Sequence, residues 1–146
     1  MRRKSILWLI AVASLGGCAT VGPDLTQSGE VSVQRSSSKL VTIQAVTVRQ
    51  DGEQLVVSGV VRRIPSSSTP IWGHVNVTAF DAAGQTVGHA VVRYSPPSLP
   101  QKGPRSSQFT ARIPAQAMQG TVVRIEHHTG GHGRDDCPPL ACAQPQ

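Results

Sequence analysis

The sequence has few aromatic side chains and no long apolar stretch. Trp, Phe and Tyr together make up 3% of the 146 residues. The longest largely apolar run, residues 6–15, is about half as long as a membrane-spanning helix, which needs about 20 residues. Lys and Arg are mostly spread singly rather than gathered into a stripe, which argues against nucleic acid as a partner. No nucleophile with a basic partner and no Gly-x-Ser-x-Gly turn is recognisable, so we expect no enzyme.

The composition favours a small all-β protein. Val, Thr, Ser and Gly are abundant, and β-branched side chains lose rotamer freedom on a helix but pack well on a pleated sheet. About 90 residues remain once the two ends are set aside, which is enough for one domain. We therefore expect a single small β-domain with a core rich in Val.

The first eighteen residues have the layout of an export signal. Residues 2–4 are Arg-Arg-Lys, residues 6–15 are almost entirely apolar, and the run ends in Leu15-Gly16-Gly17-Cys18. A basic start followed by a short apolar run and small residues is typical of a secretory signal peptide. The final four residues resemble the lipobox of bacterial lipoproteins, in which an aliphatic residue and two small residues precede a cysteine.

This resemblance to bacterial lipoprotein precursors implies that residues 1–17 are removed and that Cys18 is acylated. Two or three acyl chains, at about 0.8 kcal/mol per buried methylene, would hold the protein on a membrane essentially permanently. In lipoproteins of this type an Asp after the cysteine signals inner-membrane retention, so Ala19 implies the outer membrane, facing the periplasm. Without residues 2–4 the chain has 11 basic and 8 acidic side chains, so the net charge falls from +6 to +3.

Composition divides the rest of the chain into three parts. Residues 18–38 contain many Ser, Thr, Gln and Gly and few apolar side chains, so we expect a flexible tether behind the lipidated cysteine. Residues 39–128 carry the apolar patterns of a β-sandwich domain. Residues 129–146 contain Gly, His and Cys, and we expect a disordered tail.

Six apolar stretches of the central part have the patterns of β-strands. They cover residues 39–49, 54–64, 73–81, 86–94, 108–113 and 121–127. The turn signals Asp51-Gly52 and residues 81–84 join the first four into two hairpins. The apolar phase shifts between Ala45 and Val46, which predicts a bulge, and Gly59 inside a strand predicts a bulge or a close backbone approach. We expect six or seven strands in one small antiparallel β-sandwich of immunoglobulin-like type.

One part of the sequence resembles a known group of envelope modules. Residues 75–87 read Val-Asn-Val-Thr-Ala-Phe-Asp-Ala-Ala-Gly-Gln-Thr-Val, a strand that runs into an Asp and Gly hairpin. They are followed by Leu99-Pro100 and by Phe109 at the start of a further strand. This pattern resembles the FxLYD-type and related immunoglobulin-like modules of bacterial envelope proteins. The resemblance implies a sandwich without catalytic residues.

Two cysteines remain once Cys18 is acylated. Cys137 and Cys142 are separated by four residues, and such a pair in an oxidising compartment is expected to form a disulfide. Closing this short loop would contribute about 2 kcal/mol and would rigidify the tail more than the domain. A redox role is disfavoured, because active dithiols have two intervening residues near the start of a helix.

Histidines gather near the C-terminus, at His127, His128 and His132. Imidazole nitrogens and cysteine sulfurs suit zinc or copper, and the intervening glycines would let the chain fold back. No recurring metal-ligand spacing is present, so a Gly-rich, solvated tail without metal is the other interpretation. His74 and His89 are expected to face one another across the second hairpin as ordinary surface residues.

Two functions remain open. The first is a non-catalytic, lipid-anchored cell-envelope protein without a cofactor, whose β-sandwich presents a strand edge or loop face to an envelope protein or a cell-wall polymer. The alternative is a periplasmic lipoprotein that binds zinc or copper through His127, His128 and His132. In both, the protein contacts the membrane through the acyl chains on Cys18.

Overall fold

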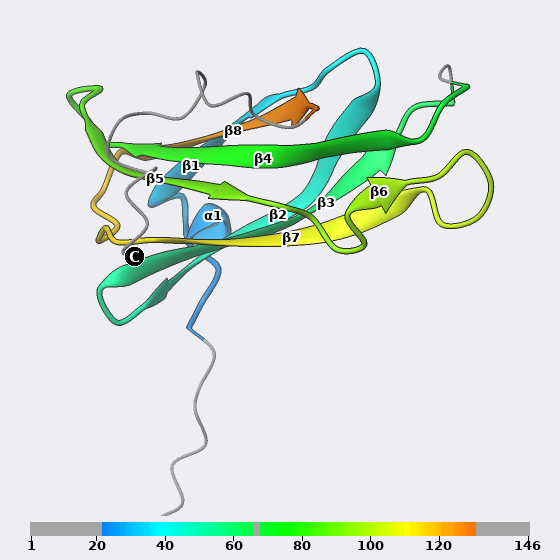
Figure 1. The fold of residues 1–146 in the computed structure, drawn as a ribbon. Coiled ribbons are helices and arrows are strands. Elements are labelled where there is room, and N and C mark those ends of the chain that lie inside the picture. Colours follow the sequence, from blue (N-terminus) through cyan, green and yellow to red (C-terminus); the bar gives the residue numbers. More distant parts are fainter. Residues whose placement is uncertain (1–21, 66–67, 131–146) are drawn as a thin grey trace, which may run out of the picture.

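Two facing β-sheets make up most of the described part of the protein (Figure 1). The computed structural model describes residues 22–65 and 68–130. These residues form α1 (Leu25–Ser28), β1 (Val31–Ser36), β2 (Val41–Asp51), β3 (Gln54–Arg63), β4 (Ile71–Phe80), β5 (Thr86–Val92), β6 (Ser98–Leu99), β7 (Ser106–Ile113) and β8 (Thr121–Thr129). One sheet has the strand order β1-β8-β4-β5, with β6 paired to the start of β4, and the other has the order β2-β3-β7. The predicted all-β sandwich is confirmed.

Each of the six predicted strands overlaps an observed strand, namely β2, β3, β4, β5, β7 or β8. The two predicted hairpins, β2–β3 and β4–β5, are antiparallel pairs. Gly52 and Gly84 in their turns have φ angles of 59° and 79°, which glycine adopts without steric cost. The carboxylate of Asp81 accepts hydrogen bonds from the backbone N–H of Ala83 at 2.9 Å and of Gln85 at 2.8 Å. The turn signals therefore mark the hairpins correctly.

The core lies between the sheets and is built from alternate residues of each strand. On β7 the residues alternate strictly between exposed and buried, because successive side chains on a strand point to opposite faces. The inward-facing side chains are mostly aliphatic, and burying one Val or Ile contributes about 1.5–3 kcal/mol. Residues exposed by at most 2% include Val57, Val61, Val75, Val77, Tyr94, Phe109, Ala111, Ile113, Val123 and Ile125.

β2 is bulged where the apolar phase of the sequence shifts. The register between β2 and β3 changes between Gln44 and Thr47, and Ala45 has a φ of 48°. On the neighbouring strand, a Cβ at Gly59 would lie 2.8 Å from two ring carbons of Phe109. The predicted bulge in β2 is confirmed. At Gly59 the close neighbour is the ring of Phe109 and not a backbone, so the predicted backbone approach is wrong.

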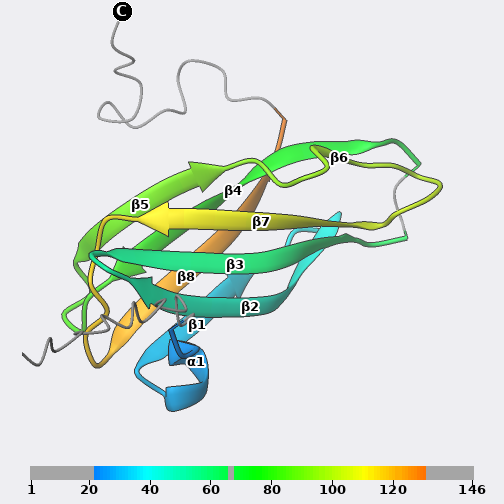
Figure 2. The ribbon, with the colours of Figure 1, turned by 90° about the horizontal axis from the view of Figure 1, so that it is seen from below.

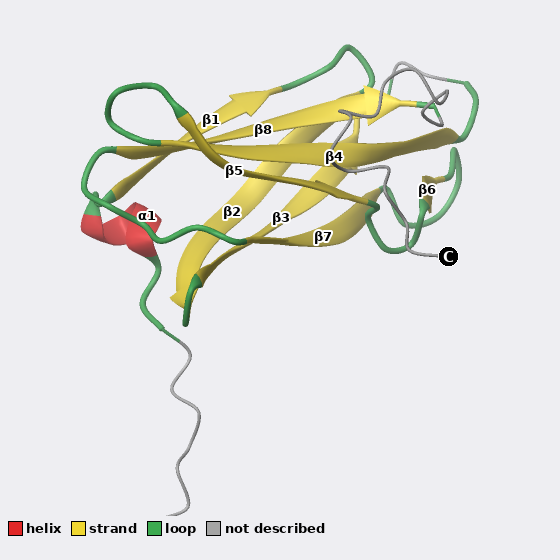
Figure 3. Ribbon diagram, turned by 60° about the vertical axis from the view of Figure 1, so that its left-hand side comes forward, coloured by secondary structure: helices red, strands yellow, loops and turns green. Residues whose placement is uncertain are grey.

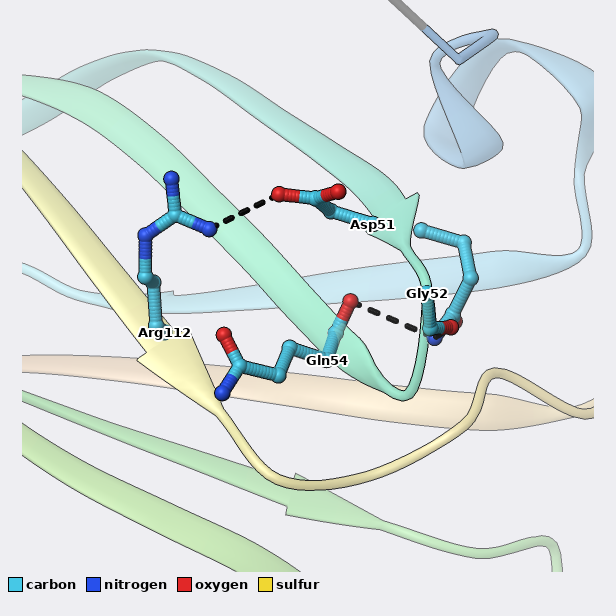
Figure 4. A network of polar contacts seen from close by, with 5 residues as sticks. Asp51, Gly52, Gln54 and Arg112 are labelled. Atoms are coloured by element: carbon cyan, nitrogen blue, oxygen red, sulfur yellow. Dashed lines mark hydrogen bonds and ion pairs between the residues drawn. The ribbon is translucent and has the colours of Figure 1, made fainter.

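Polar contacts hold the turn of the β2–β3 hairpin, at the end of the sandwich opposite β6 (Figures 1 and 4). Arg112 of β7 donates to a carboxylate oxygen of Asp51 at 2.8 Å, an exposed ion pair that contributes no more than about 1 kcal/mol. The side-chain amide of Gln50 donates to the Gly52 carbonyl at 2.8 Å, and its oxygen accepts from the Ala117 N–H at 2.9 Å. These bonds join the hairpin turn to the segment between β7 and β8.

The segment expected to be a flexible tether, residues 18–38, contains α1 and β1, so that expectation is wrong for this part. α1 packs against β1 and β2 at one end of the sandwich (Figure 3). Leu25 and Val31 bury their side chains in the core, at 7% and 3% exposure. Few apolar residues suffice here because they dock onto a sandwich that supplies the rest of the core. The folded domain therefore extends beyond the expected bounds, residues 39–128, at its N-terminal side, and β8 ends at Thr129.

Asp24 fastens this N-terminal segment to β2. As the cap of α1, its carboxylate accepts a hydrogen bond from the Thr26 N–H at 3.1 Å. The same oxygen accepts one from the Val48 N–H of β2 at 3.2 Å. Burial raises the pKa of Asp24, but the hydrogen bonds from Val48 and Thr26 outweigh it and leave the pKa lowered.

β1 occupies the place of the last strand of an immunoglobulin-like sandwich (Figure 2). In that fold, strands A, B and E share one sheet, and C, F and G lie side by side in the other. Here β2-β3-β7 has the order A-B-E and β4-β8 the order C-F, with β5 added beside C. β1 then lies beside β8 and parallel to it, with Val31 opposite Thr121. The sandwich is antiparallel except at this pair, and the described chain has eight strands rather than six or seven.

Candidate functional site

A cleft of about 530 Å³ lies where β4 begins and where β5 and β8 end. Its volume is in the range of small-ligand sites. The described residues that line it carry an indole, an imidazole and a guanidinium group, but no carboxylate. They are Trp72, Gly73, His74, Val91, Arg93, Pro97 and Gly130.

Alternation along β4 places Trp72 and His74 on the outer face of the sheet. Val75 and Val77, on the opposite face, are completely buried in the core. Trp72 is 59% exposed and Val91 is 39% exposed. Trp is on average a well-buried residue, and an exposed indole beside a cleft therefore indicates a contact surface.

His74 lies beside His128 rather than His89. The β4–β8 register places His74 opposite His128, and their rings stack with centroids 5.4 Å apart and planes 4° from parallel. In the β4–β5 hairpin, His89 lies opposite Thr78. The expectation that His74 and His89 face one another is therefore wrong, because the turn and a register shift just before it set a different pairing. His74 is also not a surface residue, since it is 6% exposed.

His127 points into the core, away from its neighbour His128. Its ring centroid lies 5.8 Å from that of Tyr94, and the residue is 8% exposed. Both ring nitrogens are buried without a hydrogen-bond partner in the described chain. Burial, followed by charge interactions with His74 and His128, lowers the pKa of His127 from 6.5 to about 4. The imidazole is therefore neutral near pH 7.

The pH dependence of stability provides a test of this buried imidazole. The unfolded chain takes up a proton on His127 below pH 6.5, whereas the folded chain takes it up only near pH 4. Stability is therefore unaffected by this group above pH 6.5 and falls between pH 6.5 and 4. At pH 5.0 we expect a loss of about 2 kcal/mol relative to pH 7.5.

Urea unfolding of the natural protein and of His127→Leu at the two pH values measures this loss. The other ionisable side chains around the ring, His74, His128 and Tyr94, are present in both proteins, so the difference between the pH dependences of the two proteins isolates His127. Identical pH dependences would contradict the assignment.

His127 and His128 cannot bind one metal ion together, because adjacent residues of a strand point to opposite faces. The alternative ligand set of His127, His128 and His132 therefore cannot act through both His127 and His128, and His132 lies outside the described residues. Within the described ranges, no three His, Cys, Asp or Glu residues are grouped to hold a metal ion.

The sequence patterns do not single out Trp72 or Arg93 as site residues. A signal for Trp72 is nevertheless present. The alternation of β4, extended back from Val75, places this indole in the polar row, where a large aromatic residue is unusual. Arg93 directly follows β5, and only the fold brings it into the same cleft.

Three other predicted site residues, Cys18, Cys137 and Cys142, lie outside the described ranges, so lipidation and the disulfide stay predictions. Among the residues that are described, none form a helix with the length and apolar character needed to cross a bilayer. The chain was compared with protein-family models, curated proteins and solved structures. It matches none of them. Its function must be inferred from its own residues.

Proposed function

We propose that the protein is a non-catalytic binding protein, anchored by lipid in the bacterial cell envelope, on the outer membrane and facing the periplasm. Its β-sandwich contacts an envelope protein or a cell-wall polymer through the Trp72 cleft. The observation that carries this proposal is the exposed indole of Trp72 beside a cleft of ligand size. Trp72, Gly73 and His74 lie on the paired strand β4, and a wall built on paired strands keeps its shape without a partner, which favours binding.

The anchor is proposed from the N-terminal sequence, in which a basic start and an apolar run lead to Leu15-Gly16-Gly17-Cys18. Cys18 would lie six residues before Asp24, which caps α1. Six residues span at most about 22 Å even when extended. The sandwich would therefore stay close to the membrane surface.

Replacing Cys18 with Ser is expected to abolish acylation, because the thiol that would carry an acyl chain is then absent. The natural protein should incorporate labelled palmitate and sediment with the membranes, whereas Cys18→Ser should incorporate none. Cys142→Ser serves as the matched control, since it removes a thiol that the proposal does not assign to lipid. A natural protein that carries no label, or a Cys18→Ser protein that still carries it, would overturn the proposed anchor.

Binding through the cleft can be tested in living cells with a photo-crosslinking amino acid. Placed at Val91, which lines the cleft, it should form covalent adducts with the partner. Placed at Thr110, exposed on β7 in the other sheet, it should form few or none. Absence of adducts at position 91, or equal adducts at both positions, would refute a role for the cleft in binding.

A further inference from the structure

The backbone of β4 at the cleft is already paired on both sides. Trp72 lies opposite Ser98 of β6, and its carbonyl accepts a hydrogen bond from the Gly130 N–H at 3.1 Å. A peptide therefore cannot add to this part of the sheet as a further strand. At β4, recognition must therefore come from side chains rather than from backbone pairing.

The exposed indole offers a flat apolar platform beside polar groups. Trp72 is 59% exposed, and the neighbouring Val91 and Pro97 add further apolar surface to the cleft. A sugar ring has an apolar C–H face that can lie on such an indole, and hydroxyls at its rim that remain free for polar contacts. The methyl of an N-acetyl group could lie against Val91 or Pro97.

The charge of the described lining residues favours anionic ligands. Arg93 is exposed, and no Asp or Glu is among the described lining residues. A guanidinium group can donate two parallel hydrogen bonds to a carboxylate, which adds direction to the charge attraction. A ligand that satisfies both Trp72 and Arg93 needs a flat apolar face and a carboxylate within one small region.

We propose that the cleft binds a glycan of N-acetylated amino sugars that carry carboxylates. One sugar ring stacks on Trp72, and a carboxylate pairs with Arg93. This inference rests on the proposed function and names the chemistry of its partner.

Two tetrasaccharides that differ in carboxylates test the proposal. One alternates N-acetylglucosamine with N-acetylmuramic acid, and the other contains N-acetylglucosamine alone on the same backbone. Trp72 is the one Trp of the sequence that follows residue 17, so its fluorescence in the full mature chain reports binding at the cleft. We expect the carboxylated tetrasaccharide to bind at least tenfold more tightly than the neutral one.

Calorimetric titration of variants separates the two contacts. Trp72→Ala should weaken binding of both tetrasaccharides at least tenfold, and Trp72→Phe should restore part of the loss. Arg93→Gln should remove the preference for the carboxylated tetrasaccharide and leave the neutral one unaffected. Arg105→Gln, a matched change of an exposed Arg outside the cleft, should alter neither. Equal urea midpoints would show that the variants are folded.

The remaining outcomes distinguish failure of the glycan proposal from failure of the proposed binding function. Equal affinities for the two tetrasaccharides, or a preference that survives Arg93→Gln, would overturn the carboxylate contact and with it the proposal. If neither tetrasaccharide binds while position 91 crosslinks to a protein in cells, the glycan is refuted and the proposed binding function stands. If neither binds and no adduct forms at position 91, both fail.

Discussion

Replacing Gly73 with Ala is expected to lower the free energy of unfolding by about 3 kcal/mol or more. A Cβ at this position would run into the carbonyl oxygen of His128 and would lie 2.8 Å from Nε2 of His127. A carbonyl held in the β4–β8 ladder cannot turn aside as the end of a flexible side chain can. The strands would have to separate at this point. Urea denaturation followed by circular dichroism measures the change.

Gly84→Ala is the matched control. Nothing lies within 4 Å of a Cβ there, but the φ of 79° is unfavourable for Ala. The expected cost is therefore backbone strain alone, about 1 kcal/mol. If the two variants lost equal stability, the close approach of β4 and β8 at Gly73 would not be the cause of the effect.

The hairpin strands could be predicted because their signals are local. Asp51-Gly52 and residues 81–84 each lie between two apolar runs. The turn fixes where the strands end, and the alternation of apolar and polar side chains indicates which face of each strand is buried. On β7 the apolar residues Phe109, Ala111 and Ile113 are the buried ones, as their alternation predicts. Patterns of this kind account for six of the strands in the described chain.

β1 could not be predicted, because its partner is distant in the sequence. Among its residues, Val31 and Val33 are the apolar ones, and the Ser, Gln and Arg around them are typical of a linker. The residue opposite Val31 is Thr121, 90 residues later. No turn joins the two strands, so no local signal marks their pairing.

The candidate site could be predicted only in part, for a similar reason. Alternation along β4 places Trp72 and His74 on one face, and that much follows from the sequence. His74 on β4 stacks on His128 on β8. Three other strands lie between β4 and β8 in the chain, so no single turn sets the register of this pair. Opposite faces for His127 and His128 follow from the strand period alone, once β8 is known to continue through Thr129.

Replacing Val31 with Asp is expected to lower the free energy of unfolding by about 3 kcal/mol or more, because a carboxylate would be buried in an apolar core. Val31 is 3% exposed and belongs to the same core as the aliphatic residues of β8. Urea denaturation measures the global effect. Hydrogen exchange of the β8 amides reports separately whether β1 has left the sheet, since β8 is its pairing partner.

Ser32→Asp is the control, because Ser32 is the next residue of β1 and is exposed. It adds the same charge to the same strand, and a surface change of this kind should alter stability by no more than about 0.5 kcal/mol. A freely moving tether would tolerate both substitutions equally. Equal, small effects of Val31→Asp and Ser32→Asp, with unchanged exchange of the β8 amides, would therefore show that β1 does not complete the sandwich in solution.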